Sequence, residues 1–205
     1  MTFHTDQEKF WATDFGNEYP SRNEGEKMIS SNLALFSKII KNCPSIKSAA
    51  ELGCNTGLNL IALNRINKDL KLRGYEINEN AWKSAREANI AEIVNATVVE
   101  PLSASTKFDL TFTKNVLIHI HPEMLPAVYQ NLYDLSNQYI MVCEYYNPTP
   151  VSIEYRGHKD RLFKRDFAGE MIKKYQLKLV DYGFNYQHDQ YFTNDDSTWF
   201  LLSKN

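Results

Sequence analysis

The sequence predicts an α/β protein with a mostly parallel, doubly wound sheet that is closed by a C-terminal antiparallel pair. β-Rich runs alternate with helical patterns between residues 45 and 144, and this alternation is typical of a parallel sheet. The first β-rich run enters its helix through a loop that contains Gly53 and Gly57, where sheets of this kind bind ligands. Two more β-rich runs, 177–182 and 197–203, follow after the alternation has stopped and look like an antiparallel pair.

The length of 205 residues suits one domain, 1–205, with a full hydrophobic core. We expect residues 1–44 to form an N-terminal helical cap and residues 45–205 to form the α/β core. Within the core, the segment at about 145–165 is expected to be a substrate loop. No internal repeat or low-complexity tract divides the chain.

The first half of the chain contains three helical patterns, each identified by its apolar spacing or its cap. Pro44 ends the first of them, and Asn78 is placed to cap the third. In order, we expect a helix at 23–42, a strand at 48–52, a helix at 57–66, a strand at 71–77, a helix from Asn78 to about Ala88 and a short strand at 96–99.

The second half repeats the alternation and then changes character after Glu144. Pro122 favours a helix start, because proline has no backbone N–H to lose there, and Asp166 is a good cap for a later helix. The elements expected here are a strand at 108–113, a helix at 122–135, a strand at 139–144, a polar aromatic loop from 147 to about 165, a helix at 166–175 and the antiparallel pair.

Composition and charge narrow the class of function. A formal net charge of -2 provides no basic footprint, so we expect no nucleic-acid partner. The start of the chain lacks the layout of a signal peptide, and no apolar run is long enough to span a bilayer, so we expect a cytoplasmic protein with no membrane partner. The three cysteines are widely spaced and odd in number, which favours reduced thiols over disulfides or a metal site.

The loop after the first strand suggests a cofactor site. Glu51 ends that strand, where its carboxylate would suit the ammonium group of a ligand. Gly53 and Gly57 allow positive φ and a close approach of the backbone to the ligand. The pattern E-x-G-x-x-x-G resembles the first motif of class I S-adenosylmethionine-dependent methyltransferases, which implies a Rossmann-like fold. Its spacing differs from the dinucleotide fingerprint G-x-G-x-x-G, which disfavours NAD.

Glu76, at the end of the second strand, is placed to receive both ribose hydroxyls of such a cofactor. The alternatives are a solvated strand end for Glu76 and a partner of a helix dipole for Glu51. Many relatives carry an Asp after the third strand for the adenine amino group. Here Glu100 could substitute for it, or backbone atoms could do so with Val98 and Val99 gripping the ring.

The resemblance also implicates the segment after the fourth strand, where Lys114 and Asn115 would lie under the methionine portion. At the N-terminus, Trp11 and Tyr19 could form a lid, and Arg22 could reach the methionine carboxylate; simple packing is the alternative for Trp11. The full set of expected cofactor residues is Trp11, Tyr19, Arg22, Glu51, Gly53, Cys54, Asn55, Gly57, Glu76, Ile77, Val99, Glu100, Lys114 and Asn115.

A narrower resemblance covers nearly the whole chain. The segments 10–23, 51–57, 114–120, 144–148 and 155–167 together resemble the pseudaminic acid biosynthesis-associated methylases, bacterial proteins linked to nonulosonic sugars. The resemblance implies a small acceptor, a pseudaminic-type sugar or its CMP conjugate, used in surface glycan biosynthesis. Fold resemblance alone does not establish a substrate.

The loop after the fifth strand carries basic and aromatic residues that suit an anionic sugar or sugar nucleotide. Arginine can bind a carboxylate or phosphate in bidentate fashion, and tyrosine rings can stack on a sugar or base. The expected substrate residues are Tyr146, Tyr155, Arg156, His158 and Arg161. The alternative is a solvated basic loop packed by its own aromatic residues.

Methyl transfer is an in-line displacement that depends on alignment, with a base where the acceptor must lose a proton. We expect His119, Glu144 and Tyr145 to be the catalytic candidates. His119 follows a strand near the cofactor loop, and Glu144 ends the fifth strand, with Tyr145 next to it. A structural role is the alternative for His119 and for Glu144. The sequence leaves open O- or N-methylation, the oligomeric state, another small amine, hydroxyl or carboxylate acceptor, and a non-catalytic, cofactor-binding regulator.

Overall fold

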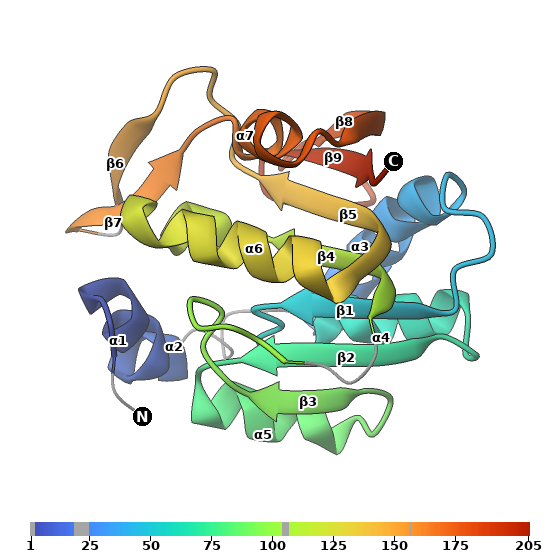
Figure 1. The fold of residues 1–205 in the computed structure, drawn as a ribbon. Coiled ribbons are helices and arrows are strands. Elements are labelled where there is room, and N and C mark those ends of the chain that lie inside the picture. The colour runs from blue at the N-terminus through green and yellow to red at the C-terminus, as the bar shows by residue number, and fades with distance from the viewer. Residues whose placement is uncertain (1–2, 19–24, 104–106, 156) are drawn as a thin grey trace.

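The computed structural model describes residues 3–18, 25–103, 107–155 and 157–205 (Figure 1). A seven-stranded sheet forms its centre, in the order β3-β2-β1-β4-β5-β9-β8. The strands are β1 (Ser48–Leu52), β2 (Lys71–Glu76), β3 (Glu92–Asn95), β4 (Phe108–Lys114), β5 (Ser136–Glu144), β8 (Lys178–Asn185) and β9 (Ser197–Ser203). The first five are parallel, and β9 pairs antiparallel with both β5 and β8. The predicted doubly wound sheet and its antiparallel pair are confirmed.

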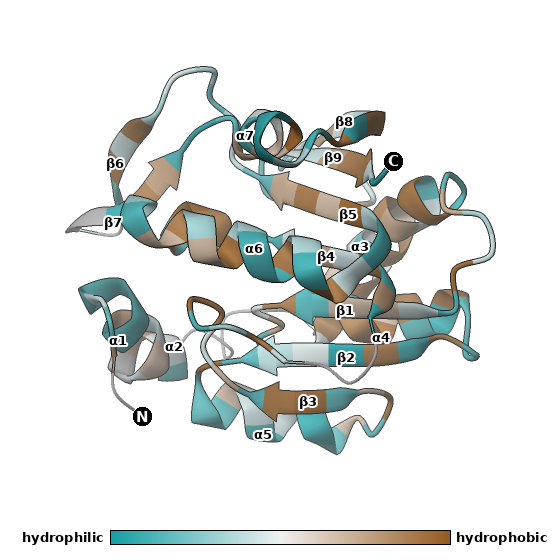
Figure 2. Cartoon of the chain, viewed as in Figure 1, coloured by the Kyte–Doolittle hydropathy of each residue, from teal (hydrophilic) through white to brown (hydrophobic). Residues whose placement is uncertain are grey.

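Helices cover both faces of the sheet. On one face lie α3 (Gly25–Ile40), α4 (Leu58–Ile66) and α5 (Glu79–Glu87), and on the other lie α6 (Leu125–Leu135) and α7 (Phe167–Tyr175). The strands serve both layers because successive side chains point to opposite faces, so that Ala49 packs with α3 and α4 while Ala50 packs with α6. Figure 2 shows β3 and much of β5 in brown, β2 in mixed colours, and helices that carry both apolar and polar residues.

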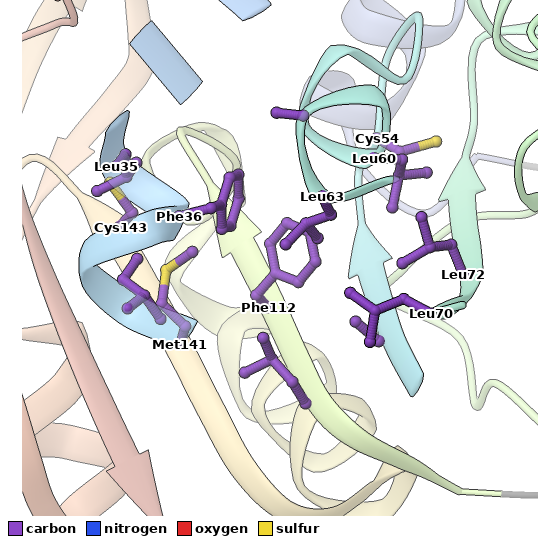
Figure 3. Packing of buried hydrophobic residues seen from close by; sticks show 14 of the residues in the cluster. Leu35, Phe36, Cys54, Leu60, Leu63, Leu70, Leu72, Phe112, Met141 and Cys143 are labelled. Carbon is purple, nitrogen blue, oxygen red and sulfur yellow. The ribbon is translucent and has the colours of Figure 1, made fainter. Parts of the chain in front are cut away.

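The layer between α3 and the sheet is closely packed, as Figure 3 shows. The ring of Phe36 on α3 meets the ring of Phe112 on β4 edge-on, with their centroids 5.3 Å apart. Neither side chain is exposed to solvent. Burial of an aromatic side chain of this size stabilises a fold by about 1.5–3 kcal/mol, so this pair fixes α3 against the centre of the sheet.

Two short helices, α1 (Asp6–Ala12) and α2 (Asp14–Glu18), form the N-terminal cap beside the carboxyl ends of the strands (Figure 1). Thr5 and Glu8 form a reciprocal capping box at the start of α1. The Glu8 carboxylate also accepts a hydrogen bond from the hydroxyl of Thr97. The Asn78 amide donates to the carbonyl of Trp11 at 3.2 Å and to Oδ1 of Asn17 at 2.9 Å. These bonds fasten the cap to the segments that follow β2 and β3.

Two expected elements differ from the structure. The third strand runs over Glu92–Asn95, whereas the sequence favoured 96–99. Its partner explains the difference, because β2 ends at Glu76, which pairs with Asn95, and leaves no strand for later residues to join. The expected loop at 147–165 contains a hairpin of β6 (Val151–Tyr155) and β7 (His158–Lys164), with Gly157 at φ 82° in its turn.

The remaining expected helices appear close to their predicted limits. The helix predicted from Pro122 begins with a 3-10 turn, η3 (Pro122–Met124), and continues as α6. A further 3-10 turn, η2 (Leu117–His119), follows β4. None of the helices in the described ranges has the length and apolar character required to cross a bilayer.

Candidate active site

A cavity of about 200 Å³ lies at the carboxyl ends of β1, β2 and β4, where the strand order reverses. In open α/β sheets this reversal leaves a crevice that binds ligands. Many of the residues predicted for the site meet there. Those on the cavity wall are Trp11, Gly53, Cys54, Asn55, Glu76, Ile77, Val99, Lys114, Asn115 and His119.

The loop after β1 forms the floor of the cavity. Gly53 has φ 77°, and its N–H donates to the carbonyl of Tyr75 at 2.8 Å. A Cβ atom at this position would lie 2.7 and 2.9 Å from the two methyl carbons of Val116. Gly57, at φ 81°, is the N-cap residue of α4 and is not part of the wall described for the cavity. The positive φ therefore favours glycine at both positions. At Gly53 the methyl groups of Val116 also leave no room for a Cβ atom.

Glu76 lies on the wall and is 8% exposed. One carboxylate oxygen accepts the N–H of Asn55 at 2.7 Å, and the other accepts the N–H of Asn78 at 2.8 Å. Burial raises the pKa of Glu76, and these backbone donors oppose the shift. Each oxygen has two lone pairs, so the carboxylate keeps acceptor capacity for a ligand.

Glu51 is fully buried and is not among the described residues of the cavity wall. Its Oε1 accepts a hydrogen bond of 2.5 Å from Nδ2 of Asn59, which does line the cavity. Burial raises the pKa of Glu51 to about 8, although the positive charge of Lys114 acts to lower it. Glu51 was predicted to face a ligand, but Asn59 lies between its carboxyl group and the cavity.

Lys114 and Asn115 follow one another at the end of β4, on the cavity wall. Asn115 adopts the left-handed conformation, with φ 56°, and its N–H donates to the carbonyl of Cys143 at 2.9 Å. Its side-chain amide donates to Oδ2 of Asp195 at 2.8 Å. The loop between β8 and β9 is thereby fastened to the end of β4.

His119 ends the short turn η2 and is 8% exposed. Its Nδ1 lies 2.8 Å from the carbonyl oxygen of Arg161. A carbonyl only accepts hydrogen bonds, so Nδ1 carries the proton and Nε2 has a free lone pair. Burial lowers the pKa of His119 to about 4, so the ring is neutral at physiological pH. The rings of Trp11 and Tyr155 lie 4.5 and 5.0 Å from it, centroid to centroid.

The structure corrects the expectation that Glu144 faces the reacting groups. Glu144 is almost fully buried behind the turn, and its carboxylate accepts the N–H groups of Val116 at 3.1 Å and Ile118 at 3.3 Å. Burial raises its pKa to about 7. The side chain holds the turn that carries His119, because backbone donors occupy its oxygens.

Tyr145 and Tyr146 also lie away from the described cavity wall. The ring of Tyr145 packs against the core on the α6 and α7 side, with Nζ of Lys164 5.3 Å from its centre. Tyr146 is 44% exposed, and its ring lies 6.0 Å from that of Phe200. Neither tyrosine is among the residues that line the cavity in the described ranges, so the structure does not place them where an acceptor site was expected.

Glu100 is corrected as well. Its carboxylate lies 2.6 Å from Nε2 of His4 at the surface, and it is not among the residues that line the cavity in the described ranges. Thr97, Val98 and Val99 line the wall in this region instead.

Of the expected substrate residues, Tyr155 and Arg161 lie on the hairpin beside His119, and neither is among the described residues of the cavity wall. Tyr155 contacts His119, and the guanidinium of Arg161 lies 5.5 Å from the centre of the Phe10 ring. Tyr19, Arg22 and Arg156 fall outside the described residues, as does the side chain of His158.

Several wall residues were not predicted from the sequence, among them Asn32, Asn59, Asn78, Asn194 and Asp195. A signal existed for Asn32, because it lies three residues after Ile29 and four before Phe36 and so falls on the apolar face of the predicted helix. The structure buries it there, with 1% of its surface exposed. Asn194 and Asp195 carry no local signal, since the pairing of β8 with β9 brings their loop to the cavity.

Residues 49–138 match the model of a protein family described as a methyltransferase domain. No curated protein sequence is significantly similar to the chain. The fold, however, is similar to that of solved methyltransferases. Magnesium protoporphyrin IX methyltransferase from Synechocystis PCC 6803, solved with bound SAH, has a TM-score of 0.69 at 13% identity, with 98% of this chain and all of that one covered.

Two further solved structures show the same similarity of fold. DesVI from Streptomyces venezuelae has a TM-score of 0.68 at 12% identity, with 93% of this chain and 98% of that one covered. The plantazolicin methyltransferase BpumL, in complex with SAH, has a TM-score of 0.66 at 13% identity, with 97% and 94% covered. The match over residues 49–138 covers less than half of the chain, and together with the similarity of fold it supports a methyltransferase that uses S-adenosylmethionine.

Proposed function

We propose that the enzyme transfers a methyl group to a small polar acceptor that reaches the cavity beside His119. The observation that carries this proposal is the state of His119, a neutral imidazole whose protonated nitrogen is held by the Arg161 carbonyl. His119 lines the cavity, and its second nitrogen remains available as an acceptor because the carbonyl holds only Nδ1. Such a group can orient an acceptor hydroxyl or amine and receive its proton.

The residues of the cavity fit S-adenosylmethionine. Glu76 offers acceptor capacity for two ribose hydroxyls, and Val98 and Val99 offer an apolar surface for adenine. Amide oxygens of wall residues such as Asn32 and Asn194 have no hydrogen-bond partner among the described residues, which suits a ligand that brings donors. When bound, the cofactor supplies an electrophilic methyl group.

The chain's own residues then account for the rest of the chemistry. Trp11 and Tyr155 pack around His119 and limit the access of water to its ring. Glu144 holds the turn that carries His119 through two backbone N–H groups. These contacts fix the imidazole at the cavity wall, and positioning of this kind supplies much of the acceleration of a displacement.

For the acceptor, we propose a pseudaminic-type nonulosonic sugar or its CMP conjugate. The sequence resemblance supports this choice, and so does the position of the hairpin, which places Tyr155 and the backbone of Arg161 against His119. Another small metabolite with an amine, hydroxyl or carboxylate is the alternative. Purified enzyme with methyl-labelled cofactor should label the nonulosonic acceptor, and labelling of other metabolites alone would contradict the sugar assignment.

The cofactor part of the proposal is tested at Glu76. Glu76→Ala should weaken S-adenosylhomocysteine binding by about tenfold to a hundredfold, because loss of charge-assisted hydrogen bonds costs about 1.5–3 kcal/mol. Calorimetry measures the affinity, and circular dichroism checks that the variant is folded. Glu79→Ala is the matched control, since Glu79 is exposed on α5 and pairs only with Lys83 among the described residues. Unchanged affinity in folded Glu76→Ala would refute the ribose assignment.

A further inference from the structure

Strand β8 is the last strand of the sheet, and its outer edge is open. It pairs with β9 along one side, and no described strand pairs with it along the other (Figure 1). Its ladder with β9 has a bulge between Leu179 and Asp181 and is regular from Asp181 to Asn185. The outward backbone groups of such a stretch form a template for a further strand, and proteins commonly protect them with proline or charged residues. Residues 182–185 contain neither.

One face of this edge strand carries exposed aromatic side chains. Tyr182 pairs with Phe200 across the ladder, and their rings stack with centroids 6.2 Å apart. Phe200 packs against the core on the α6 and α7 side, so Tyr182 and, two residues later, Phe184 lie on that face of the sheet. Tyr182 is 65% exposed and Phe184 is 59% exposed, so the helical layer does not cover them. Exposed aromatic residues beside an open edge are typical of a protein–protein contact.

Gly183, between these two residues, leaves the middle of the strand free for the approach of another backbone. It pairs with Trp199 on the opposite face, where a Cβ atom at Gly183 would lie 2.6 Å from Cζ2 of the indole. Glycine inside a strand often marks a place where a second backbone comes close. The regular stretch from Asp181 to Asn185 is centred on this residue.

The two ends of β8 carry opposite charges. At its start, Lys178 is exposed, and Lys173 and Lys174 are exposed in the last turn of α7, which leads into the strand. Beyond its end, Gln187 holds the exposed Asp196 through its backbone N–H at 2.9 Å and its side-chain amide at 2.7 Å. An antiparallel copy of the strand would bring the basic start of one to the acidic end of the other. A parallel copy would place like charges together.

We propose that two copies of the chain join along β8, antiparallel and related by a two-fold axis at Gly183. A two-fold axis lets each copy present the same edge to the other, so that the contact closes on itself. Tyr182 of one copy then lies opposite Phe184 of the other on the same face, twice in the dimer. Position 178 of one copy lies opposite position 188 of the other, which brings Lys178 to the loop that carries Asp196. This contact does not depend on the proposed function.

Sedimentation of the purified protein at about 1 to 100 μM tests the association. Wild-type protein should form a dimer that dissociates on dilution, and dimerisation should slow amide hydrogen exchange in β8. Tyr182→Lys places a charge where the two strands meet and should raise the dissociation constant about thirtyfold or more. Val151→Lys is the matched control, at an exposed apolar position of β6, and should leave the constant unchanged. Circular dichroism checks that both variants are folded.

Charge reversal at low salt tests the direction of the two strands, because surface charges are least screened there. Lys178→Glu and Asp196→Lys should each weaken dimerisation about tenfold, since like charges then meet. An equimolar mixture of these two variants should form a heterodimer, in which both contacts regain opposite charges. If the mixture associates no better than its components, the antiparallel arrangement is wrong.

Three further results would overturn the proposal. The first is a protein that stays monomeric over the whole range of concentration. The second is an unchanged dissociation constant in folded Tyr182→Lys, because the dimer would then use another surface. The third is an assembly larger than a dimer, which a closed two-fold contact does not form.

Discussion

At His119, a single backbone carbonyl decides which ring nitrogen carries the proton. The Arg161 oxygen requires a donor at Nδ1, and the surrounding rings of Trp11 and Tyr155 remove water that would stabilise a charged imidazole. The tautomer and the charge of His119 are therefore set by β7, which carries Arg161, together with the N-terminal cap, which carries Trp11. Neither neighbour is close to His119 in the sequence.

The buried neutral state of His119 predicts a loss of stability in acid. Its pKa is about 4 in the folded enzyme and about 6.5 in an unfolded chain, so the unfolded state binds more protons between these values. Stability should be complete above pH 6.5 and fall as the pH drops towards 4. Urea unfolding at pH 7 and pH 4.5 should show a loss about 2–3 kcal/mol larger for wild type than for His119→Phe. An equal loss in both proteins would show that the ring is not buried in its neutral form.

Glu51 predicts a proton release on cofactor binding. Its pKa of about 8 reflects burial and the nearby Glu76, opposed by Asn59 and by the positive charge of Lys114. A ligand ammonium placed near Glu51 should lower that pKa and drive off the proton. Titration calorimetry at pH 7.5 in two buffers of different ionisation enthalpy measures the release. S-adenosylhomocysteine should release a proton and 5′-methylthioadenosine should not; a Glu51→Gln variant should release none with either.

Gly53 is constrained first by its neighbour Val116. Gly53→Ala combines a positive φ with contacts below 3.0 Å to the Val116 methyl groups, and should lower the free energy of unfolding by about 2–4 kcal/mol. Adding Val116→Ala to Gly53→Ala should recover the part of the free energy of unfolding that is lost through the clash. In a double-mutant cycle, the two substitutions together should therefore destabilise the protein less than the sum of their separate effects. If the effects of the two substitutions are purely additive, the positive φ alone explains why glycine stands at position 53.

Among the elements, the α1–α2 cap is attached to the core by hydrogen bonds and by aromatic contacts. The side chain of Asn17 on α2 accepts hydrogen bonds of 2.9 Å from Asn78 and from Asn80. Glu8 makes a second attachment through Thr97. A peripheral element of two short helices opens more readily than the core of the sheet, which suits a cover over a ligand site.

The Asn17 contacts predict a local effect on this cap. Asn17→Ala should speed amide hydrogen exchange over residues 6–18, while the global free energy of unfolding changes by no more than about 0.5 kcal/mol. Exchange followed by mass spectrometry measures the first quantity and urea unfolding the second. Asn80→Ala, which removes one of the two donors, should give a smaller increase. Slow exchange in both variants would show that other contacts hold the cap.

At the scale of the whole molecule, the sequence predicts those features of the fold and of the site that depend on local periodicity and on where a strand ends. The alternation of strands and helices predicts the parallel sheet, and the end of β2 places Glu76 at the cavity. The limits of β3 depend on where its partner ends, which no local pattern records. Asn32 and Asn194 meet at the cavity only through tertiary packing, and Glu144 turns inward because the turn after β4 offers it backbone donors.

The position of β9 in the sheet has a consequence for how the protein is made. The strand β9 follows β8 in the chain but lies between β5 and β8 in the sheet. During synthesis on the ribosome, β8 therefore emerges before the strand that joins it to the sheet. Until then β8 and the edge of β5 have no partner strand on the side where β9 will lie, and they are open to contact with other nascent chains. During this interval chaperones would have to protect the unpaired strands from aggregation, and a pause in translation after β8 would lengthen the interval.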